Sequence, residues 1–296
     1  MTEFPLVSII SVNYNSAEVT ADMIRSLNQI SYPNIEIVIV DNASTHPPDE
    51  LKQQFPEIIY IKSNENLGFA GGNNLGIASA KGKYFLLLNN DTEVHPHFLE
   101  PLVAFMEKDS SVGCVSSKLI YHHTPGLIQY AGNTGFNVYT GQAFSRGYKE
   151  TDQGQYDDII PIKIAHGAAM MFSRKVLDTI GPMADIYFLY YEEVDYCKRI
   201  LDAGFKMYYV GTSTVYHKES ISTGKNSPLK EYYLTRNRLL FIRRNLKGIQ
   251  KLASSLFFIL FAVPKGIFLH LIKGDFSRLN ALWKGVYWHL SHLGKT

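Results

Sequence analysis

The sequence contains few cysteines and no recognisable leader segment. Only Cys114 and Cys197 occur, with neither a CxxC pair nor a histidine cluster nearby, which argues against a disulfide framework. Both fall at positions predicted to face the core, where we expect the reduced, buried thiols of an intracellular protein. Residues 1–7 lack a basic stretch followed by an apolar run, so they predict no signal peptide.

Two glycine-rich phosphate-binding loops are also missing. A dinucleotide-binding domain needs glycines between its first strand and first helix, but this chain has Asn13, Tyr14, Asn15 and Ser16 there. No GxxxxGK[ST] motif occurs either. If the chain binds a nucleotide, a metal ion is therefore the expected carrier of the phosphate charge.

The charge is divided unevenly along a chain that is long enough for a large core. Its 296 residues, 46% of them hydrophobic, fit one large α/β domain or two smaller ones. Residues 224–296 carry 13 basic and two acidic residues, whereas residues 1–223 carry 16 basic and 25 acidic residues. A basic tail on an acidic body predicts an anionic membrane surface, and no nucleic acid, as the partner of the tail.

Strands and helices alternate in the first part of the chain. Alternation at this spacing predicts parallel strands with right-handed crossovers, hence an α/β fold. The predicted strands are residues 7–12, 35–40, 58–61 and 84–88, with a first helix at 17–30.

Past residue 112 the pattern is looser. Residues 122–162 are rich in Gly, Tyr, Thr and Asp without clear periodicity, which is typical of an acceptor-facing insertion or a mobile loop. Further strands are expected at 113–120 and 206–210, and a helix at 188–203 that ends before Gly204.

Asp91 follows the apolar run Tyr84–Leu88, which predicts a strand buried on both faces. Residues that leave the carboxyl end of such a strand lie in the crevice where open α/β sheets bind ligands. A carboxylate there, next to Asn89 and Asn90, is a hard oxygen ligand suited to Mg²⁺ or Mn²⁺ carrying a diphosphate. The alternative is a carboxylate that caps the next helix.

Asp41 follows the second predicted strand in the same way. At the carboxyl end of a parallel strand its carboxylate could accept hydrogen bonds from a nucleotide base or ribose. The alternative is a turn formed by the pair Asp41-Asn42.

Three carboxylates, Glu192, Glu193 and Asp195, follow the aromatic run Tyr187–Tyr191. Acidic residues favour the first turn of a helix, so a solvated helix start is one interpretation. The preceding aromatic residues would instead place the carboxylates beside an apolar wall, where a carboxylate has a raised pKa and is a better base.

His217 ends another apolar stretch, and a histidine at a strand end is more often structural than catalytic. It gains interest if the fold brings it near Asp91. The segment His166–Phe172 supplies small residues to which a ligand could approach closely, although a tightly packed strand would show the same composition.

In chain order, these segments resemble an inverting family 2 glycosyltransferase of the GT-A fold. The resemblance covers roughly residues 5–245 and is closest to the branch of rhamnosyltransferases and galactofuranosyltransferases of surface-polysaccharide assembly. The matching segments are Val7–Asn15, Val40–Ser44, Asn66–Ala70 with Asn73 and Gly76, Leu88–Thr92, His166–Ala169, Tyr191–Asp195 with Arg199, Val215–His217, Ser222–Gly224 and Arg236–Arg238.

The resemblance implies a role for each group of residues. Asp91 would bind a divalent metal, Mg²⁺ or Mn²⁺, with His217 as a further ligand. Glu193 would be the catalytic base, while Glu192 and Asp195 would shape and orient that site. The nucleotide-sugar site would comprise Asn13, Asn15, Asp41, Asn42, Asn66, Gly68, Asn73, Asn90 and Gly167.

The chain departs from the family pattern at two places. The Asp-x-Asp motif is replaced by Asn89-Asn90-Asp91, which leaves one certain carboxylate for the metal. The base position, often Asp in relatives, is Glu193, and the choice between it and Glu192 stays open. A Gln-x-x-Arg-Trp motif of processive synthases is absent, so we expect the addition of one or a few sugars.

The implied activity is the inverting, non-processive transfer of a rhamnose-like sugar from a nucleoside diphosphate to a hydroxyl of a glycan or lipid-diphosphate-linked acceptor. One alternative is a GT-A module that binds sugar nucleotides or glycans without turnover. Another is a nucleotidyltransferase, which should carry a glycine-rich basic loop after its first strand.

The predicted domain is residues 1–245, with a nucleotide-binding half at 1–110 and an acceptor-binding half at 111–245, followed by a basic amphipathic tail at 246–296. The apolar run Leu252–Pro264 has 13 residues, short of the ~20 that span a bilayer, and Pro264-Lys265 should interrupt a longer helix. Basic and aromatic residues flank it, as in a segment that lies in the membrane interface.

The alternatives for the tail are a transmembrane or re-entrant hairpin, and a buried packing helix or dimer contact. We expect the protein in the cytoplasm, at the inner face of the cytoplasmic membrane. The sequence gives no indication of an oligomeric state.

Overall fold

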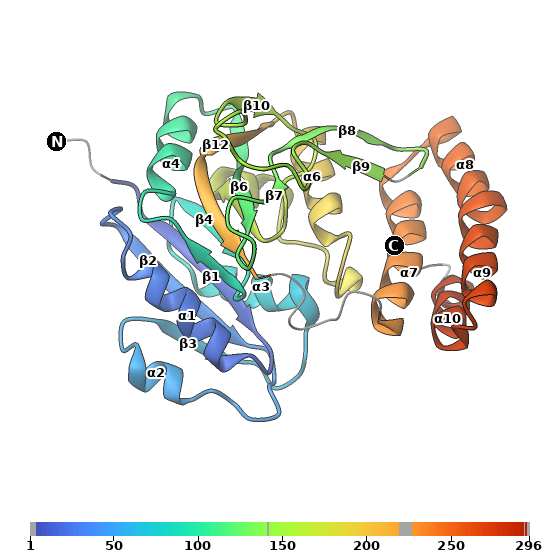
Figure 1. The fold of residues 1–296 in the computed structure, drawn as a ribbon, viewed down its shortest axis with the longest axis horizontal. Helices are drawn as coiled ribbons and strands as arrows, with labels where there is room; N and C mark the ends of the chain where they lie inside the picture. Colours follow the sequence, from blue (N-terminus) through green and yellow to red (C-terminus); the bar gives the residue numbers. More distant parts are fainter. Residues whose placement is uncertain (1–3, 141, 219–226, 293, 295–296) are drawn as a thin grey trace.

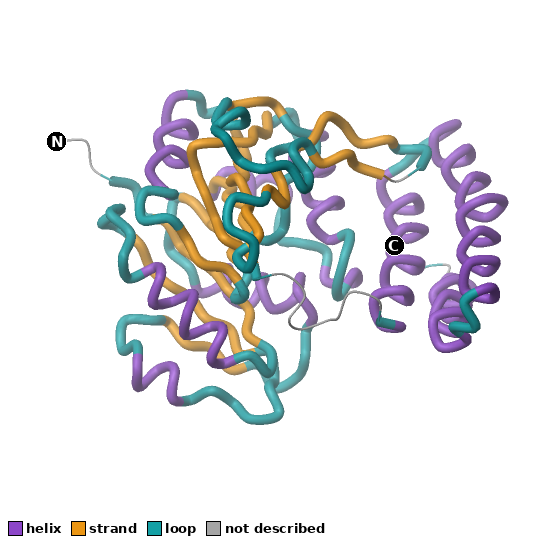
Figure 2. The backbone as a smooth tube through the Cα atoms, viewed as in Figure 1, coloured by secondary structure: helices purple, strands orange, loops and turns teal. Residues whose placement is uncertain are grey.

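A computed structural model describes residues 4–140, 142–218, 227–292 and 294 (Figure 1). A central sheet is flanked by helices, and the last four helices lie together beside it at one end of the molecule (Figures 1 and 2). The segment Ser222–Gly224, part of the resemblance, lies outside the described residues.

The strands form one ten-stranded sheet and a separate pair, β8 and β9. They are β1 (Val7–Asn13), β2 (Ile35–Asp41), β3 (Ile59–Lys62), β4 (Tyr84–Leu88), β5 (Thr92–Val94), β6 (Val112–Tyr121), β7 (Ile128–Tyr130), β8 (Asn133–Asn137), β9 (Gln142–Ser145), β10 (Ile159–Pro161), β11 (Ala169–Ser173) and β12 (Lys206–His217).

The helices include one 3₁₀ turn, η1, and one π-helical turn, η2. They are α1 (Ala17–Leu27), α2 (Glu50–Gln54), α3 (Gly68–Ser79), α4 (Leu99–Lys108), α5 (Arg174–Ile180), η1 (Asp185–Tyr187), α6 (Glu192–Asp202), α7 (Pro228–Asn245), α8 (Gly248–Phe257), η2 (Phe258–Ala262), α9 (Val263–Ile272) and α10 (Phe276–Ser291).

The sheet order is β10-β12-β6-β11-β4-β1-β2-β3, and its half at β4-β1-β2-β3 confirms the predicted α/β arrangement. Strands β3, β2, β1 and β4 are parallel, so their carboxyl ends meet at one edge. All five residues of β4 are buried, as expected of a strand covered on both faces. Asp41 ends β2, and Asp91 follows β4 by three residues, at the same edge.

Two further pairings bring the second half of the chain to that edge. Strand β11 inserts antiparallel between β4 and β6, and β12 runs parallel to β6. The short strand β5, directly after Asp91, pairs with the end of β12, with Thr92 opposite His217. The predicted halves at 1–110 and 111–245 therefore share one sheet.

The predicted helix at residues 188–203 is wrong at its start, because α6 begins at Glu192. Phe188, Tyr190 and Tyr191 have positive φ angles of 64°, 67° and 76°, which are rare for large side chains. Asn237 of α7 holds this strained segment by donating hydrogen bonds to the carbonyls of Tyr187, Leu189 and Tyr190. The predicted helix end is confirmed, since Gly204 has φ +86°.

Residues 122–162, for which no regular structure was predicted, contain strands β7 to β10. Strand β7 pairs antiparallel with β6, and β10 pairs antiparallel with β12. The short length of these strands explains why no periodicity was visible in the sequence.

The predicted interruption at Pro264-Lys265 is wrong, because the helical path from Gly248 to Ile272 is continuous over 25 residues. A π-helical turn, Phe258–Ala262, precedes the proline. Such a turn shifts the backbone hydrogen-bond register, which accommodates the missing N–H of proline. By length and composition this helix could cross a membrane, with a mean hydropathy of 2.0 and only 11% of its most apolar stretch buried.

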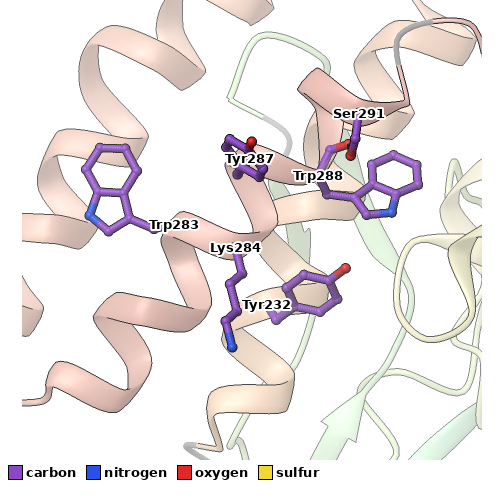
Figure 3. A pocket seen from close by; sticks show the side chains of 6 residues that line it. All are labelled: Tyr232, Trp283, Lys284, Tyr287, Trp288 and Ser291. Atoms are coloured by element: carbon purple, nitrogen blue, oxygen red, sulfur yellow. The ribbon is translucent and has the colours of Figure 1, made fainter.

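The last helix, α10, packs against α7 and α9. A small second core joins Tyr187 to Leu240, Phe241 and Phe258. A groove of about 670 Å³ is lined by residues of α7 and α10 (Figure 3). Its lining residues are Tyr232, Trp283, Lys284, Tyr287, Trp288 and Ser291.

Candidate active site

Asp91 and His217 contact each other at the edge where β4 and β12 end. The Oδ1 atom of Asp91 lies 3.1 Å from Nε2 of His217, and the two residues are 8% and 6% exposed. The backbone fixes this contact, because Lys218 N donates to the carbonyl of Asp91 at 2.8 Å. Two segments 126 residues apart in the chain thus present an oxygen and a nitrogen donor side by side.

These two side chains fit a divalent cation only in part. Carboxylate oxygen and imidazole nitrogen are both ligands of Mn²⁺ and related ions. Among residues 4–140, 142–218, 227–292 and 294, however, no cluster of three or more His, Cys, Asp or Glu side chains is placed to hold a metal. The remaining ligands of such an ion would have to be water or oxygens of a bound diphosphate.

A line of buried hydrogen bonds connects this edge to the end of β2. Asn90 Nδ2 donates to Thr20 Oγ1 at 2.9 Å, and this hydroxyl donates to Asn13 Oδ1 at 2.8 Å. Asn13 Nδ2 then donates to Asp41 Oδ1 at 2.9 Å. Asp41 is 1% exposed and also accepts from the hydroxyl of Ser44 at 2.6 Å. The structure therefore brings Asn13, Asp41 and Asn90 together in one network.

Asn15 extends this network to the loop after β2. It has φ +52°, and its backbone N–H donates to Ser44 Oγ at 2.8 Å. Its side-chain oxygen accepts from the N–H of Thr45, also at 2.8 Å. The loops after β1 and β2 are thereby joined at the edge of the sheet.

Asn42, Asn66 and Gly68 form a second group. Asn42 Nδ2 donates to Asn66 Oδ1 and to the Gly68 carbonyl, both at 3.0 Å. Gly68 has φ +69°, and a Cβ there would come within 2.2 Å of the Phe188 carbonyl oxygen, so only glycine fits. The N–H of Phe69 donates to the same carbonyl at 2.6 Å. Within α3, Asn73 Nδ2 donates to the Phe69 carbonyl at 2.8 Å.

The close approach at Phe188 connects the nucleotide-side loop to the segment that leads into α6. Glu192, the first residue of α6, is 3% exposed, and its Oε2 has no hydrogen-bond partner among the residues that the structure describes. Burial and, second, the charge of Glu193 raise the pKa of Glu192 well above its ordinary value. A protonated carboxyl is therefore favoured at this position.

Glu193 is partly exposed and faces a small residue of the segment before β11. A Cβ added to Gly167 would lie 3.9 Å from the Cβ and Cγ atoms of Glu193 and 3.9 Å from the ring of Phe69. Burial also raises the pKa of the Glu193 carboxyl, although backbone N–H groups near the start of α6 offset part of the effect.

The segment His166–Ala168 lies between the two halves of the site. The His166 ring is 6.1 Å from the His217 ring, a Cβ at Gly167 would lie 3.9 Å from Glu193, and the Ala168 carbonyl accepts from Asn89 N at 3.0 Å. Burial and the nearby His217 lower the pKa of His166 to about 3, so its ring is neutral. One short segment therefore touches both the Asp91 side and the Glu193 side.

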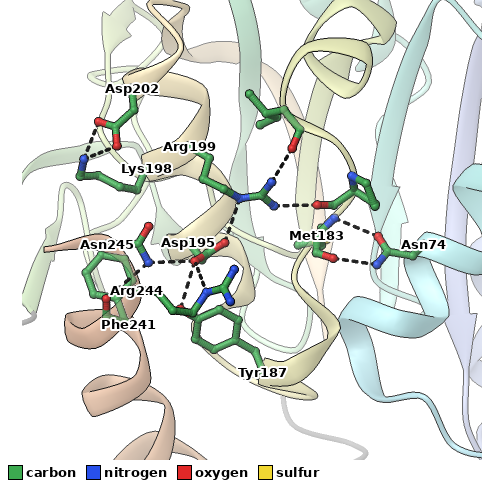
Figure 4. A network of polar contacts seen from close by, with 12 residues as sticks. Asn74, Met183, Tyr187, Asp195, Lys198, Arg199, Asp202, Phe241, Arg244 and Asn245 are labelled. Carbon is green, nitrogen blue, oxygen red and sulfur yellow. Dashed lines mark hydrogen bonds and ion pairs between the residues drawn. The ribbon is translucent and has the colours of Figure 1, made fainter. Parts of the chain in front are cut away.

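Asp195 belongs to a network between α6 and α7 (Figure 4). Its carboxylate is 1% exposed and accepts from Arg199 Nε at 3.0 Å, Tyr187 OH at 3.1 Å and Asn245 Nδ2 at 2.8 Å. Arg244 Nε adds a contact at 3.4 Å. These contacts make Asp195 the anchor that fixes α6 to the carboxyl end of α7.

Several residues of this region escaped sequence reasoning. Thr20 completes the network around Asn13, and Gln129 Oε1 contacts His217 Nδ1 at 2.7 Å. Thr20 lies in a helix and Gln129 in a three-residue strand, where no motif marks them. The positive φ of Phe188 likewise has no local signal.

Comparison with known families gives a match over more than half of the chain. Residues 8–181 match the family described as glycosyl transferase family 2. The low-salt glycan biosynthesis hexosyltransferase Agl10 of Haloferax volcanii is 28% identical over 242 residues, which are 79% of this chain and 74% of that protein. The O-antigen biosynthesis protein RfbC of Myxococcus xanthus is 27% identical over 78% of this chain, but the chain spans only 19% of that longer relative.

Solved structures with the same fold have low sequence identity. The mannosyltransferase PcManGT from Pyrobaculum calidifontis, in complex with GDP-Man and Mn²⁺, has a TM-score of 0.60 and 15% identity, and the match covers 100% of this chain and 77% of that one. A fragment of S. aureus TarS has a TM-score of 0.62 and 17% identity, covering 95% and 80%. At these identities the likeness establishes the fold alone.

Proposed function

The chain belongs to glycosyl transferase family 2 and is a glycosyltransferase, and from this we propose that it transfers a sugar from a nucleoside diphosphate to a hydroxyl of a glycan or lipid-linked acceptor in polysaccharide synthesis. The names of the hexosyltransferase Agl10 and of RfbC, both of glycan assembly, support this class of product. The bound GDP-Man of PcManGT and UDP-GlcNAc of TarS support the class of donor. Within that class we propose a rhamnose-like sugar, on the resemblance of the sequence motifs.

The observation that carries the proposal is the meeting of three segments at one edge of the sheet. Asp91 and His217 contact each other, and Glu193 reaches the same segment, 166–168, that lies beside His217. The network from Asn90 to Asp41 continues along the same edge. A donor lying along this edge would place its nucleotide beside Asp41 and its diphosphate beside Asp91.

Asp91 and His217 are the residues that would hold a divalent ion, Mg²⁺ or Mn²⁺. Such an ion would supply a Lewis acid for the negative charge that develops on the leaving diphosphate. Asp41, with Asn13 and Asn15 in its network, would orient the base or ribose of the donor. The segment at Gly68 would keep the loop after β3 close to the sugar.

Glu193 would be the base of a single displacement. Its carboxylate takes the proton of the acceptor hydroxyl while the acceptor oxygen forms a bond to the anomeric carbon and the bond from this carbon to the diphosphate breaks. One displacement inverts the configuration. Glu193 is preferred over Glu192 because it is partly exposed beside Gly167, whereas Glu192 is buried.

We place the enzyme at the inner face of the cytoplasmic membrane, held by residues 246–296. Large apolar side chains are uncovered along α8 to α9, and Leu260, Phe261 and Phe268 are 58%, 62% and 62% exposed. The groove on α7 and α10 adds Trp and Tyr side chains with Lys284, a composition enriched where protein meets lipid headgroups. Attachment of this kind suits an acceptor that cannot leave the bilayer.

The experiment is a panel of nucleoside-diphosphate sugars, incubated with the full chain, acceptor lipid extract and Mn²⁺ or EDTA. We expect release of nucleoside diphosphate with one donor, loss of release with EDTA, and the opposite anomeric configuration in the product. The matched variant Asp91→Asn should lose transfer, while Asp49→Asn, at an exposed position before α2, should keep it. A product that retains the donor configuration would contradict the mechanism.

A further inference from the structure

Both ring nitrogens of His217 have a partner within the chain. Nε2 faces Asp91 Oδ1 at 3.1 Å, and Nδ1 lies 2.7 Å from Oε1 of Gln129. The imidazole is 6% exposed and Gln129 is 8% exposed. The histidine thus lies in a buried row between a carboxylate and an amide.

The amide of Gln129 determines which ring nitrogen carries the proton. In the orientation that the side chain takes in the structure, Oε1 faces the ring, and a carbonyl oxygen can only accept a hydrogen bond. The contact is satisfied when Nδ1 carries a proton and donates to this oxygen. In the tautomer protonated at Nδ1, the lone pair of Nε2 points at Asp91.

In this tautomer two acceptors, Nε2 of His217 and Oδ1 of Asp91, face each other across 3.1 Å. Such a pair repels unless a positive charge lies between or beside the two atoms. A divalent ion bound by both atoms removes the repulsion, and neutral imidazole binds metals through its unprotonated nitrogen.

The two neighbours of Gln129 hold it in place, at an irregularity where Ile128 and Tyr130 pair with Ile120 and Leu119 of β6. It is the middle residue of β7, and its neighbours Ile128 and Tyr130 are both completely or almost completely buried. Strand β7 pairs with the end of β6, whose other edge pairs with the end of β12, where His217 lies opposite Tyr121. Gln129 and His217 are therefore fixed by the same strand.

We infer that Gln129 is a positioning residue for the metal site: by accepting from Nδ1–H, it fixes the tautomer and ring orientation in which His217 Nε2 can bind the ion beside Asp91. This inference rests on the proposed function, which makes His217 a metal ligand. Ligating histidines generally need such an outer partner, and its removal weakens metal binding by about 10–100-fold.

The test uses the full chain and Mn²⁺ alone, with bound metal measured by electron paramagnetic resonance. Gln129→Leu keeps the approximate size but removes the acceptor, Gln129→Glu keeps an acceptor, and Gln53→Leu is the control at an exposed position of α2. We expect Gln129→Leu to weaken Mn²⁺ binding by about 10–100-fold, while the other two variants bind like wild type. Circular dichroism checks that each variant is folded.

A second readout is independent of metal. In metal-free protein labelled with ¹⁵N-histidine, at a pH where the ring is neutral, we expect His217 to be protonated at Nδ1 in wild type and Gln129→Glu. The Leu variant should lose this preference. If Gln129 served stability alone, Gln129→Leu would lower the melting temperature but would leave His217 protonated at Nδ1.

Two outcomes would overturn the inference while leaving the proposed transfer intact: equal Mn²⁺ affinity of wild type and Gln129→Leu, or a His217 ring protonated at Nε2. The variant His217→Ala separates the two proposals. If it binds Mn²⁺ like wild type, the metal site itself is misplaced, and the positioning role of Gln129 is overturned with it.

Discussion

Replacing Glu193 with Gln separates the proposed base from its buried neighbour. Glutamine keeps the size and shape of the side chain but cannot accept a proton at neutral pH. The matched variant is Glu192→Gln, one residue earlier in the same helix. Because burial raises the pKa of the Glu192 carboxyl well above its ordinary value, we expect a neutral glutamine to be tolerated at this position.

The expected loss of rate follows from the contribution of a general base. Proton removal in the transition state typically contributes about 10²–10⁴-fold, so Glu193→Gln should lower kcat by this factor, or about 2.7–5.5 kcal/mol of barrier. Donor affinity should stay within about twofold, since the glutamine preserves the packing beside Gly167. Glu192→Gln should retain most of the activity.

The pH dependence gives an independent check on the same residue. Burial raises the pKa of Glu193 above the ordinary value of 4.5. A base must be deprotonated, so kcat/KM should rise with pH through this raised pKa, and the acid limb should lie above that of an exposed glutamate. The residual activity of Glu193→Gln should lack this limb, whereas Glu192→Gln should keep it.

The assay is release of nucleoside diphosphate from the donor found in the panel, measured from pH 4.5 to 8 with donor affinity followed by calorimetry. Near-normal kcat in Glu193→Gln would refute the base assignment. If only Glu192→Gln lost activity and the acid limb of its pH profile, Glu192 would be the base. Loss of donor binding in Glu193→Gln would show that the side chain serves the donor.

Three further predictions concern stability and location. Asp195→Asn should lower the free energy of unfolding in urea by about 3 kcal/mol, the lower end of the cost of a broken buried ion pair. The lower end applies because the arginine partners of Asp195 are each 24% exposed. An unchanged urea midpoint would contradict the anchor role. The raised pKa of Glu192 means that its contribution to stability is present at low pH and lost as pH rises through the folded-state pKa. Glu192→Gln should therefore raise Tm at pH 8 by about 2–4 °C, which corresponds to ~1 kcal/mol of stability, and should leave Tm unchanged at pH 4. An equal rise in Tm at both pH values would exclude ionisation of Glu192 as the cause. Leu260→Glu with Phe261→Glu should move the protein from anionic liposomes to the soluble fraction in flotation, whereas Lys52→Glu, in α2, should not; an unchanged distribution would argue against a lipid-facing helix.

The strands before residue 90 could be predicted to within one or two residues, because each is an apolar run bounded by polar residues. The strained segment Phe188–Tyr191 could not. Three of its four side chains are aromatic and continue the helical pattern. Its carbonyls are held from distant parts of the chain: Asn237 donates to those of Leu189 and Tyr190, and the N–H of Phe69 donates to that of Phe188. The continuous helix past Pro264 was missed for a similar reason, since a π-helical turn has no sequence signature.

Within the candidate site, the sequence predicted residue types better than contacts. Asp41 and Asp91 were expected at one edge because parallel strands share their carboxyl ends. The contact of Asp91 with His217 depends on strand β5 pairing with β12, and three residues give no periodicity from which to predict it. Gln129 was invisible because its significance comes only from the ring that it faces.

The Asp195 anchor also sets a limit on how the protein can be shortened. The family match ends at residue 181, before α6 and strand β12, so it does not mark the end of the folded domain. A chain cut before Arg244 would lose both Arg244 and Asn245, two of the groups around a carboxylate that is 1% exposed, and would also uncover Tyr187. The smallest fragment that keeps the partners of Asp195 therefore extends through Asn245, beyond the end of the family match.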